Sequence, residues 1–173
     1  GADSGSLRLD TSPGQPEIVF RRAMLDMPLI VGRNGDLGVV PSFNAQDRLT
    51  LNADLILAGG GASFASLIFA GDLSIDGTGD VVMSDQAAPG DLPPAQSLSL
   101  TALENTAADV TLGPEVMLRG LGQVTGSAFP APPRLTLQGG AKAEGGTLEL
   151  ASSIDVEARF LGAAAGATLT HMA

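Results

Sequence analysis

The sequence predicts an all-β protein with the architecture of a parallel β-helix (β-solenoid) whose coils are about 18–19 residues long. Three observations predict this fold: short alternating apolar units, turn residues between nearly all of them, and a recurring spacing. Two alternatives stay open, a β-sandwich or jelly roll and an intertwined trimeric β fibre. A chain of 173 residues is one domain or a piece of a longer repetitive chain.

Units in which apolar and other residues alternate dominate the chain from residue 48 onward. A period of two places successive side chains on opposite faces of a strand. Gly, Asn, Asp or Pro separates nearly all of the units, as in Gly77-Thr78-Gly79-Asp80. The units are 49–51, 55–57, 67–69, 73–75, 81–83, 98–100, 110–112, 116–118, 135–137, 148–150, 154–156 and 168–170.

The spacing of these units indicates a repeat. Leu49 and Leu67 are 18 residues apart, and both Val116 to Leu135 and Leu135 to Ile154 span 19. A fixed step is typical of repeat architectures in which each coil stacks on the last. We therefore expect Leu49 and Leu67 to be neighbours in adjacent coils.

The repeat divides the chain into two predicted parts. Residues 48–173 form the β-solenoid, and residues 1–47 form an atypical N-terminal cap or a small module. A Pro-rich insertion at 85–96 lacks strand units, because proline has no ladder donor. Residues 16–27 are the nearest candidate for a helix.

Composition excludes several classes of function. Nineteen acidic residues against nine basic ones give a net charge of −10, which repels nucleic acid and anionic membrane surfaces. The apolar runs are too short to span a bilayer, so we expect no membrane insertion. With no cysteine, the chain has no disulfides and no thiolate metal sites.

Three runs of sequence carry a resemblance to a known class. β-Helix passenger repeats of autotransporters and filamentous-haemagglutinin-like adhesins resemble Leu-Thr-Leu-Asn-Ala-Asp-Leu-Ile-Leu-Ala-Gly-Gly-Gly (49–61), Gly-Asp-Leu-Ser-Ile-Asp-Gly-Thr-Gly-Asp-Val-Val-Met-Ser (71–84) and Arg-Leu-Thr-Leu-Gln-Gly-Gly-Ala-Lys-Ala-Glu-Gly-Gly-Thr-Leu-Glu-Leu (134–150). Phage fibre and spike proteins are a similar-looking class. The resemblance implies an extracellular or cell-surface location, with a virion as the alternative, and a task in adhesion or scaffolding.

Carboxylates are the main resource for chemistry. Asp72, Asp76 and Asp80 recur every four residues in a Gly-rich segment and are a candidate Ca²⁺ site. Aspartates at corners more often accept hydrogen bonds from the turn backbone, which is the alternative to a Ca²⁺ site. We expect no cofactor and no metal beyond this candidate. Asp155 and Glu157 share one strand face. With Glu149 on a neighbouring coil they are candidates for an acidic strip that supplies the carboxylate pair of a polysaccharide-active enzyme. Solvation of the outer face is the alternative that we favour.

The apolar content exceeds what a narrow interior holds, so some apolar residues must face outward. Alternation predicts that Ile68, Val82 and Met117 face outward and lie at a contact, because exposed apolar faces imply a covering partner. We expect a non-catalytic structural or adhesive protein that forms a homo-oligomer or contacts a neighbouring structural protein, with a glycan or cell-surface receptor as a further partner. A virion appendage is the alternative, followed by a polysaccharide-active β-helix enzyme.

Overall fold

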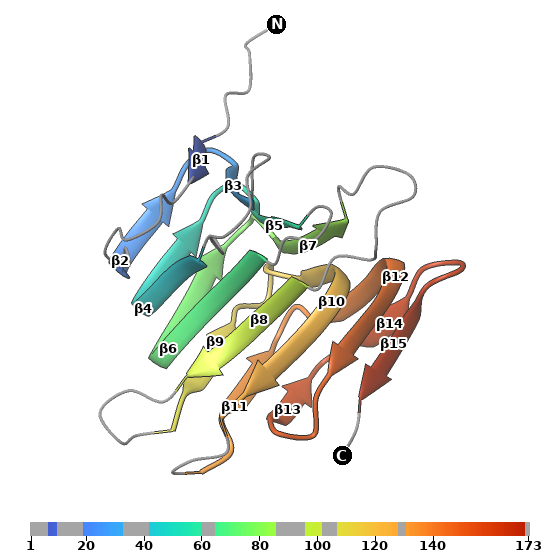
Figure 1. Ribbon diagram of the computed structural model, residues 1–173. Coiled ribbons are helices and arrows are strands. Elements are labelled where there is room, and N and C mark those ends of the chain that lie inside the picture. Colours follow the sequence, from blue (N-terminus) through green and yellow to red (C-terminus); the bar gives the residue numbers. More distant parts are fainter. Residues whose placement is uncertain are drawn as a thin grey trace, which may run out of the picture.

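The protein is an all-β chain in a computed structural model, which describes residues 7–9, 19–32, 42–59, 65–85, 96–101, 107–127 and 131–171. Across these ranges there is no helix, and the fifteen strands belong to one sheet (Figure 1). Every pair of neighbouring strands runs parallel. The all-β prediction is confirmed, and parallel pairing differs from the antiparallel sheets of a sandwich.

The pairing arranges the strands in three ladders, which we call A, B and C. Ladder A contains β1 (Leu7–Leu9), β3 (Leu29–Gly32), β5 (Leu55–Gly59), β7 (Val81–Asp85), the first parts of β10 (Leu118–Gly126) and β12 (Ala141–Leu150), and β14 (Leu161–Ala163). Ladder B contains the first parts of β2 (Val19–Leu25), β4 (Ser42–Leu51) and β6 (Ala65–Gly77), then β8 (Gln96–Thr101), the second parts of β10 and β12, and β15 (Thr168–His171). Ladder C contains the second parts of β2, β4 and β6, then β9 (Asp109–Leu112), β11 (Arg134–Leu137) and β13 (Asp155–Ala158).

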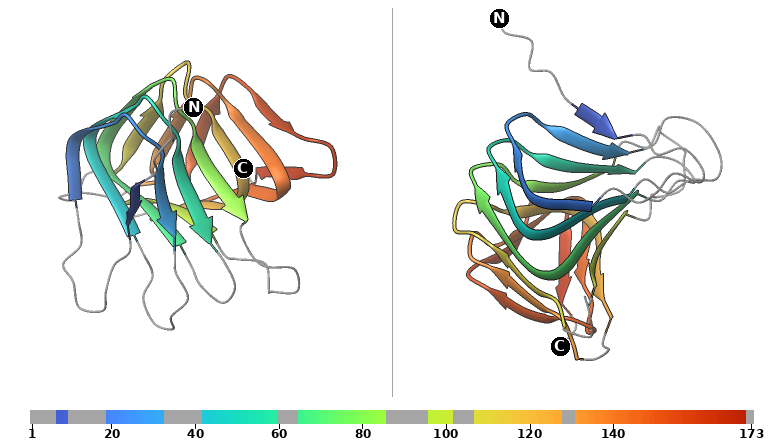
Figure 2. Two further views of the ribbon diagram at one scale, coloured as in Figure 1. Left: turned by 90° about the horizontal axis from the view of Figure 1, so that it is seen from above. Right: turned by 90° about the vertical axis from the view of Figure 1, so that its left-hand side faces the viewer.

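The chain visits the ladders in the order A, B, C and then returns to A. We call one such passage a rung. Figure 2 shows the rungs side by side, from blue strands at one side of the stack to red strands at the other.

One hydrophobic core, mostly aliphatic, lies between the three ladders. The flanking residues of the alternating units point inward and are buried, such as Leu55 and Leu57 in ladder A, while Ile56 between them is half-buried. Inward residues of all three ladders belong to a single cluster. Burying one such side chain contributes about 1.5–3 kcal/mol, so the repeated columns supply most of the stability.

Long strands pass from one ladder to the next through residues with positive φ. Arg22, Asp47 and Gly71 have φ of 53°, 65° and 66°, and lie where β2, β4 and β6 bend from ladder B to ladder C. Gly120, with φ of 117°, lies at the bend of β10, where an added Cβ would strike the backbone carbonyl of Met83. These bends change the direction of a strand without ending it.

The predicted step of 18–19 residues is wrong. Leu49 pairs with Ile75 instead of Leu67, and steps range from 20 residues (Ala141 to Leu161) to 37 residues (Leu73 to Val110). The reason is that β4 and β6 each run through two ladders, so each contains two of the short units. Leu49 and Leu67, which are 18 residues apart, therefore lie on different ladders: Leu49 is in the ladder C part of β4, and Leu67 is in the ladder B part of β6.

Three further predictions concern the early part of the chain and the insertion. The boundary at residues 47/48 is not a boundary in the sheet, because it falls inside β4 and because β2 and β3 pair directly with β4 and β5. The helix candidate at 16–27 is wrong for its described part, where Val19–Leu25 is a strand. Of the insertion predicted at 85–96, residues 86–95 lie outside the described residues, and Asp85 and Gln96 are strand residues of β7 and β8.

Candidate functional site: a charged cluster across four strands

Five charged residues meet on the outer face of ladder A, and we call them the Arg119 cluster: Asp54, Asp80, Arg119, Lys142 and Glu144. Asp54 and Asp80 immediately precede β5 and β7, Arg119 lies in β10, and Lys142 and Glu144 lie in β12. Alternation explains the arrangement. Leu118 points inward and is buried, so Arg119 points outward, in register with Val82 on one side and Lys142 on the other.

The guanidinium of Arg119 contacts three carboxylates. Its Nε donates to Asp80 Oδ2 at 2.7 Å and one terminal nitrogen donates to Asp54 Oδ2 at 3.1 Å. The other terminal nitrogen lies 3.6 Å from Glu144 Oε2, and Lys142 Nζ lies 2.7 Å from the second oxygen of Glu144. A fixed fork of donors suits such multidentate pairing, which links strands from successive rungs.

The two aspartates also bind the backbone of the next rung. Asp54 Oδ1 accepts a hydrogen bond of 2.9 Å from the Asp80 backbone N–H, and Asp80 Oδ1 accepts one of 3.0 Å from the Met117 backbone N–H. Each carboxylate therefore satisfies a corner donor with one oxygen and Arg119 with the other. This is the corner role that sequence analysis considered for Asp80.

The cluster shifts the pKa values of two of its members. Burial opposes the charged form of Arg119, but the hydrogen bond and charge of Asp80, with the charges of Asp54 and Glu144, raise its pKa. The hydrogen bond from Lys142 lowers the pKa of Glu144. Burial opposes this shift, and the charges of Lys142 and Arg119 add to it. Each shift favours the ionised form, so the cluster is held together as ion pairs.

A shallow hollow of about 390 Å³ lies beside the cluster, lined in part by Val82, Arg119, Leu121 and Glu144. Because Arg119 is already bonded to carboxylates within the protein, its charge is balanced at this hollow. The arrangement is suited to holding neighbouring strands together and is poorly suited to binding an anion. We call this stabilising role of the Arg119 cluster the clamp role.

The three predicted Ca²⁺ ligands have different surroundings. Asp72 is exposed and in register with Asp109, whereas Asp76 accepts a 3.2 Å hydrogen bond from Ser74 and lies 3.4 Å from Arg48. Asp80 belongs to the Arg119 cluster. Within the described ranges no three His, Cys, Asp or Glu side chains form a group that could hold a metal ion. The structure therefore does not bring the three aspartates together.

The three predicted contact residues are half-buried, and each lies between two buried neighbours in the sequence. Ile68 lies on ladder B, Val82 on ladder A, and Met117 immediately before β10. Val82 shares an outward column with Ile30 and Ile56, both also half-buried. Alternation thus places these side chains as expected, and a contact at them stays a prediction.

The acidic strip is divided between two ladders. Asp155 and Glu157 are exposed on β13 in ladder C, where Glu157 lies 2.9 Å from Arg134. Glu149 lies in the ladder B part of β12 and accepts a 3.1 Å hydrogen bond from Gln123.

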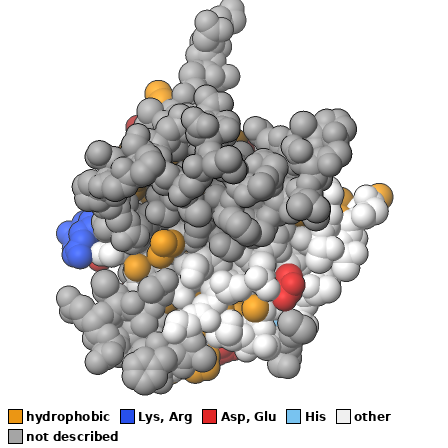
Figure 3. All heavy atoms as spheres, viewed as in Figure 1, with side chains coloured by type: hydrophobic (Ala, Val, Ile, Leu, Met, Phe, Trp, Pro, Cys, Tyr) orange, Lys and Arg blue, Asp and Glu red, His pale blue; other side chains and the backbone are white. Residues whose placement is uncertain are grey.

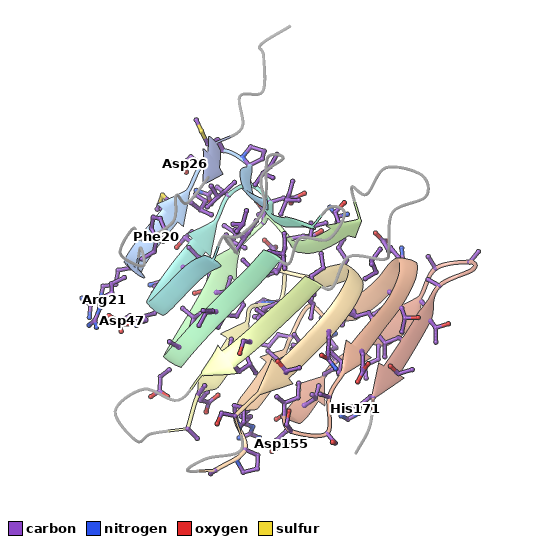
Figure 4. The ribbon with its side chains drawn as sticks, viewed as in Figure 1. Phe20, Arg21, Asp26, Asp47, Asp155 and His171 are labelled. Carbon is purple, nitrogen blue, oxygen red and sulfur yellow. The ribbon has the colours of Figure 1, made fainter. Side chains whose placement is uncertain are left out.

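Figure 4 shows Asp155 and His171 toward one side of the stack and Arg21 at the opposite side. The face viewed in Figure 3 shows mainly backbone and uncharged side chains among its described residues.

Comparisons with protein-family models, with curated proteins and with solved structures found no match for this chain. Among the described residues, no helix has the length and apolar character needed to cross a membrane.

Of the five residues in the Arg119 cluster, only Asp80 was predicted from the sequence as a candidate site residue, and Asp54, Arg119, Lys142 and Glu144 were missed. The signal for Asp54 is that Asp54-Leu55-Ile56-Leu57 and Asp80-Val81-Val82-Met83 have the same pattern 26 residues apart, which is the true step at this place. Arg119 has no such signal, because it is 39 residues from Asp80 in the sequence.

Proposed function

We propose that the chain is a parallel β-solenoid that acts as a non-catalytic structural or adhesive element on the surface of a cell or particle. Three parallel ladders around one core make a stiff scaffold whose outer faces are available for contact with copies of itself or a neighbouring structural protein. The Arg119 cluster adds stiffness, because it ties together strands from successive rungs.

One observation carries the proposal, namely the outward column of ladder A. Ile30, Ile56 and Val82 are in register and half-buried, and the column continues through Arg119 and Lys142. An aliphatic strip beside charges held in place by ion pairs suits a protein–protein contact, which combines an apolar centre with a polar rim. We propose that ladder A is the contact face between copies.

A virion appendage is the second candidate, favoured by the same column. In a trimeric fibre, three copies bury one aliphatic face each against a common axis. The native mass therefore separates the candidates, because a closed trimer favours the appendage and another closed oligomer favours the surface scaffold.

The test is sedimentation equilibrium of the wild-type chain, of Ile56→Lys, and of Thr111→Lys as a matched control. Thr111 is also an outward, half-buried residue between buried neighbours, but it lies on ladder C. We expect a discrete oligomer that Ile56→Lys dissociates and Thr111→Lys leaves intact, with both variants folded. A wild-type chain without a discrete oligomer, or one whose oligomer Ile56→Lys leaves unchanged, would contradict the proposed contact face.

A further inference from the structure

A shallow hollow of about 290 Å³ lies on the outer face of ladder C and extends over three successive rungs. One wall is Pro114, which follows β9, and β11 and β13 form the floor. Exposed or half-buried side chains line it, Thr136 and Gln138 from one rung and Glu157 and Arg159 from the next. Because the hollow faces sideways from the stack, a further coil beyond β13 would lengthen the stack without filling the hollow.

Arg159 brings an unbalanced positive charge to this hollow. Its exposed side chain forms no ion pair and no hydrogen bond with the described part of the chain. The neighbouring carboxylate of Glu157 lies 2.9 Å from Arg134 instead. Most other described basic side chains pair with a carboxylate, namely Arg22, Arg48, Arg119, Arg134 and Lys142. The donors of the Arg159 guanidinium therefore remain open to a ligand.

The groups around Arg159 match the chemistry of an acidic sugar. A guanidinium binds a carboxylate through two parallel hydrogen bonds. The hydroxyl of Thr136 and the amide of Gln138 can each donate and accept, as sugar hydroxyls require. The exposed ring of Pro114 offers an apolar surface to the C–H face of a sugar ring. A volume of about 290 Å³ is near the lower limit of small-molecule sites, which suits one sugar unit.

Charge and topology disfavour other anionic ligands. The carboxylate of Glu157 also lines the hollow, so a doubly charged phosphate group is repelled more than a single carboxylate. The net charge of −10 opposes a polymer that is acidic at each unit. An acidic peptide could add a strand only at a free edge, and both edges of β11 are already paired, with β9 and β13.

We propose that this hollow binds a single acidic sugar of a glycan, with Arg159 on its carboxylate and with Thr136 and Gln138 on its hydroxyls. The inference rests on the proposed adhesive function, to which it adds a class of ligand. It uses the outer face of ladder C, whereas the proposed contact between copies uses ladder A.

Titration of the ¹⁵N-labelled protein with methyl glucuronide, followed by NMR, tests the proposal. Methyl glucoside is the matched neutral probe, and acetate is a carboxylate without a sugar ring. We expect methyl glucuronide to shift the amide signals of Gln138 and Arg159 in a saturable way. The other two probes should bind about tenfold more weakly, because each lacks part of the recognised groups. No saturable shift with methyl glucuronide, or equally tight binding of acetate, would overturn the proposal.

Three variants locate the binding. Arg159→Gln should lower the affinity for methyl glucuronide about tenfold, and Thr136→Val about threefold, because a bond to a charged group contributes more than a neutral one. Arg21→Gln is the matched control, since Arg21 is also exposed but lies at the opposite side of the stack from Asp155 in β13 (Figure 4). Unchanged affinity in folded Arg159→Gln would overturn the site. A loss in Arg159→Gln with none in Thr136→Val would also overturn it, because a point charge alone would then attract the anion.

The outcome is separable from that of the proposed contact between copies. If Ile56→Lys dissociates a discrete oligomer but methyl glucuronide does not bind, the acidic-sugar site is wrong and the ladder A contact stands. If methyl glucuronide binds as expected to a chain that forms no discrete oligomer, the site stands and the ladder A contact is wrong.

Discussion

Replacing Arg119 with methionine tests whether the Arg119 cluster stabilises the stack. The variant keeps an aliphatic stem but removes the donors that Asp54, Asp80 and Glu144 share. The carboxylates of Asp54 and Asp80 keep one backbone N–H each, from Asp80 and Met117. They lose the only cation that lies between them among the described ion pairs.

The expected loss follows from the burial of the pair. The side chains of Arg119 and Asp80 are 32% and 25% exposed, so solvent screens their interaction only in part. A hydrogen bond to a charged group contributes about 1.5–3 kcal/mol, and Arg119 makes two short ones. Since partial exposure reduces each, we expect the free energy of unfolding to fall by about 3 kcal/mol.

Arg134→Met is the matched control. Arg134 also donates to a carboxylate, that of Glu157, at 2.9 Å, but the two side chains are 53% and 67% exposed. An exposed pair contributes about 0–1 kcal/mol. Urea unfolding of both variants, followed by circular dichroism, measures the difference. If Arg119→Met loses no more stability than Arg134→Met, the clamp role of the Arg119 cluster is refuted.

Three further predictions follow from the core, the bends and the ion pairs. Leu135→Asp should cost several kcal/mol (about 3–5) or prevent folding, because it buries an unpaired charge in ladder C, whereas Thr136→Asp should be nearly neutral in the same urea assay. Gly120→Ala should lower the melting temperature markedly, because its φ of 117° and the nearby Met83 carbonyl leave no room for a Cβ. The pKa of Glu144 is lower in the folded state than its ordinary value of 4.5, so its pairing stabilises the fold above that pH and is lost as pH falls through the folded pKa. Glu144→Gln should therefore reduce stability near neutral pH, leave it unchanged in acid, and flatten a plot of unfolding midpoint against pH.

Local alternation predicted much of the interior correctly. In the unit Leu73-Ser74-Ile75, as in most others, the flanking residues are buried and the central one is half-buried. This works because a strand has a fixed period of two, whatever it pairs with. The same rule placed Ile68 and Val82 outward.

Register was not predictable in the same way. The units resemble one another, so Leu49 matches Leu67 in pattern as well as it matches its true partner Ile75. The bend at Asp47 decides the pairing, and a non-glycine residue with positive φ has no clear sequence signal. The Arg119 cluster depends on this register, which explains why its pairs were missed.

The most direct test of the three-ladder arrangement is disulfide formation between engineered cysteines in this cysteine-free chain. Ile56 and Val82 are opposite each other in ladder A, and parallel neighbours about 4.8 Å apart lie within reach of a disulfide. Ile56 and Ser74 are separated by the 18-residue step that the repeats suggest, but they lie on ladders A and C. We predict that Ile56→Cys with Val82→Cys forms an intramolecular disulfide on mild oxidation and that Ile56→Cys with Ser74→Cys does not. The opposite result would contradict the register on which the fold, the Arg119 cluster and both proposals rest.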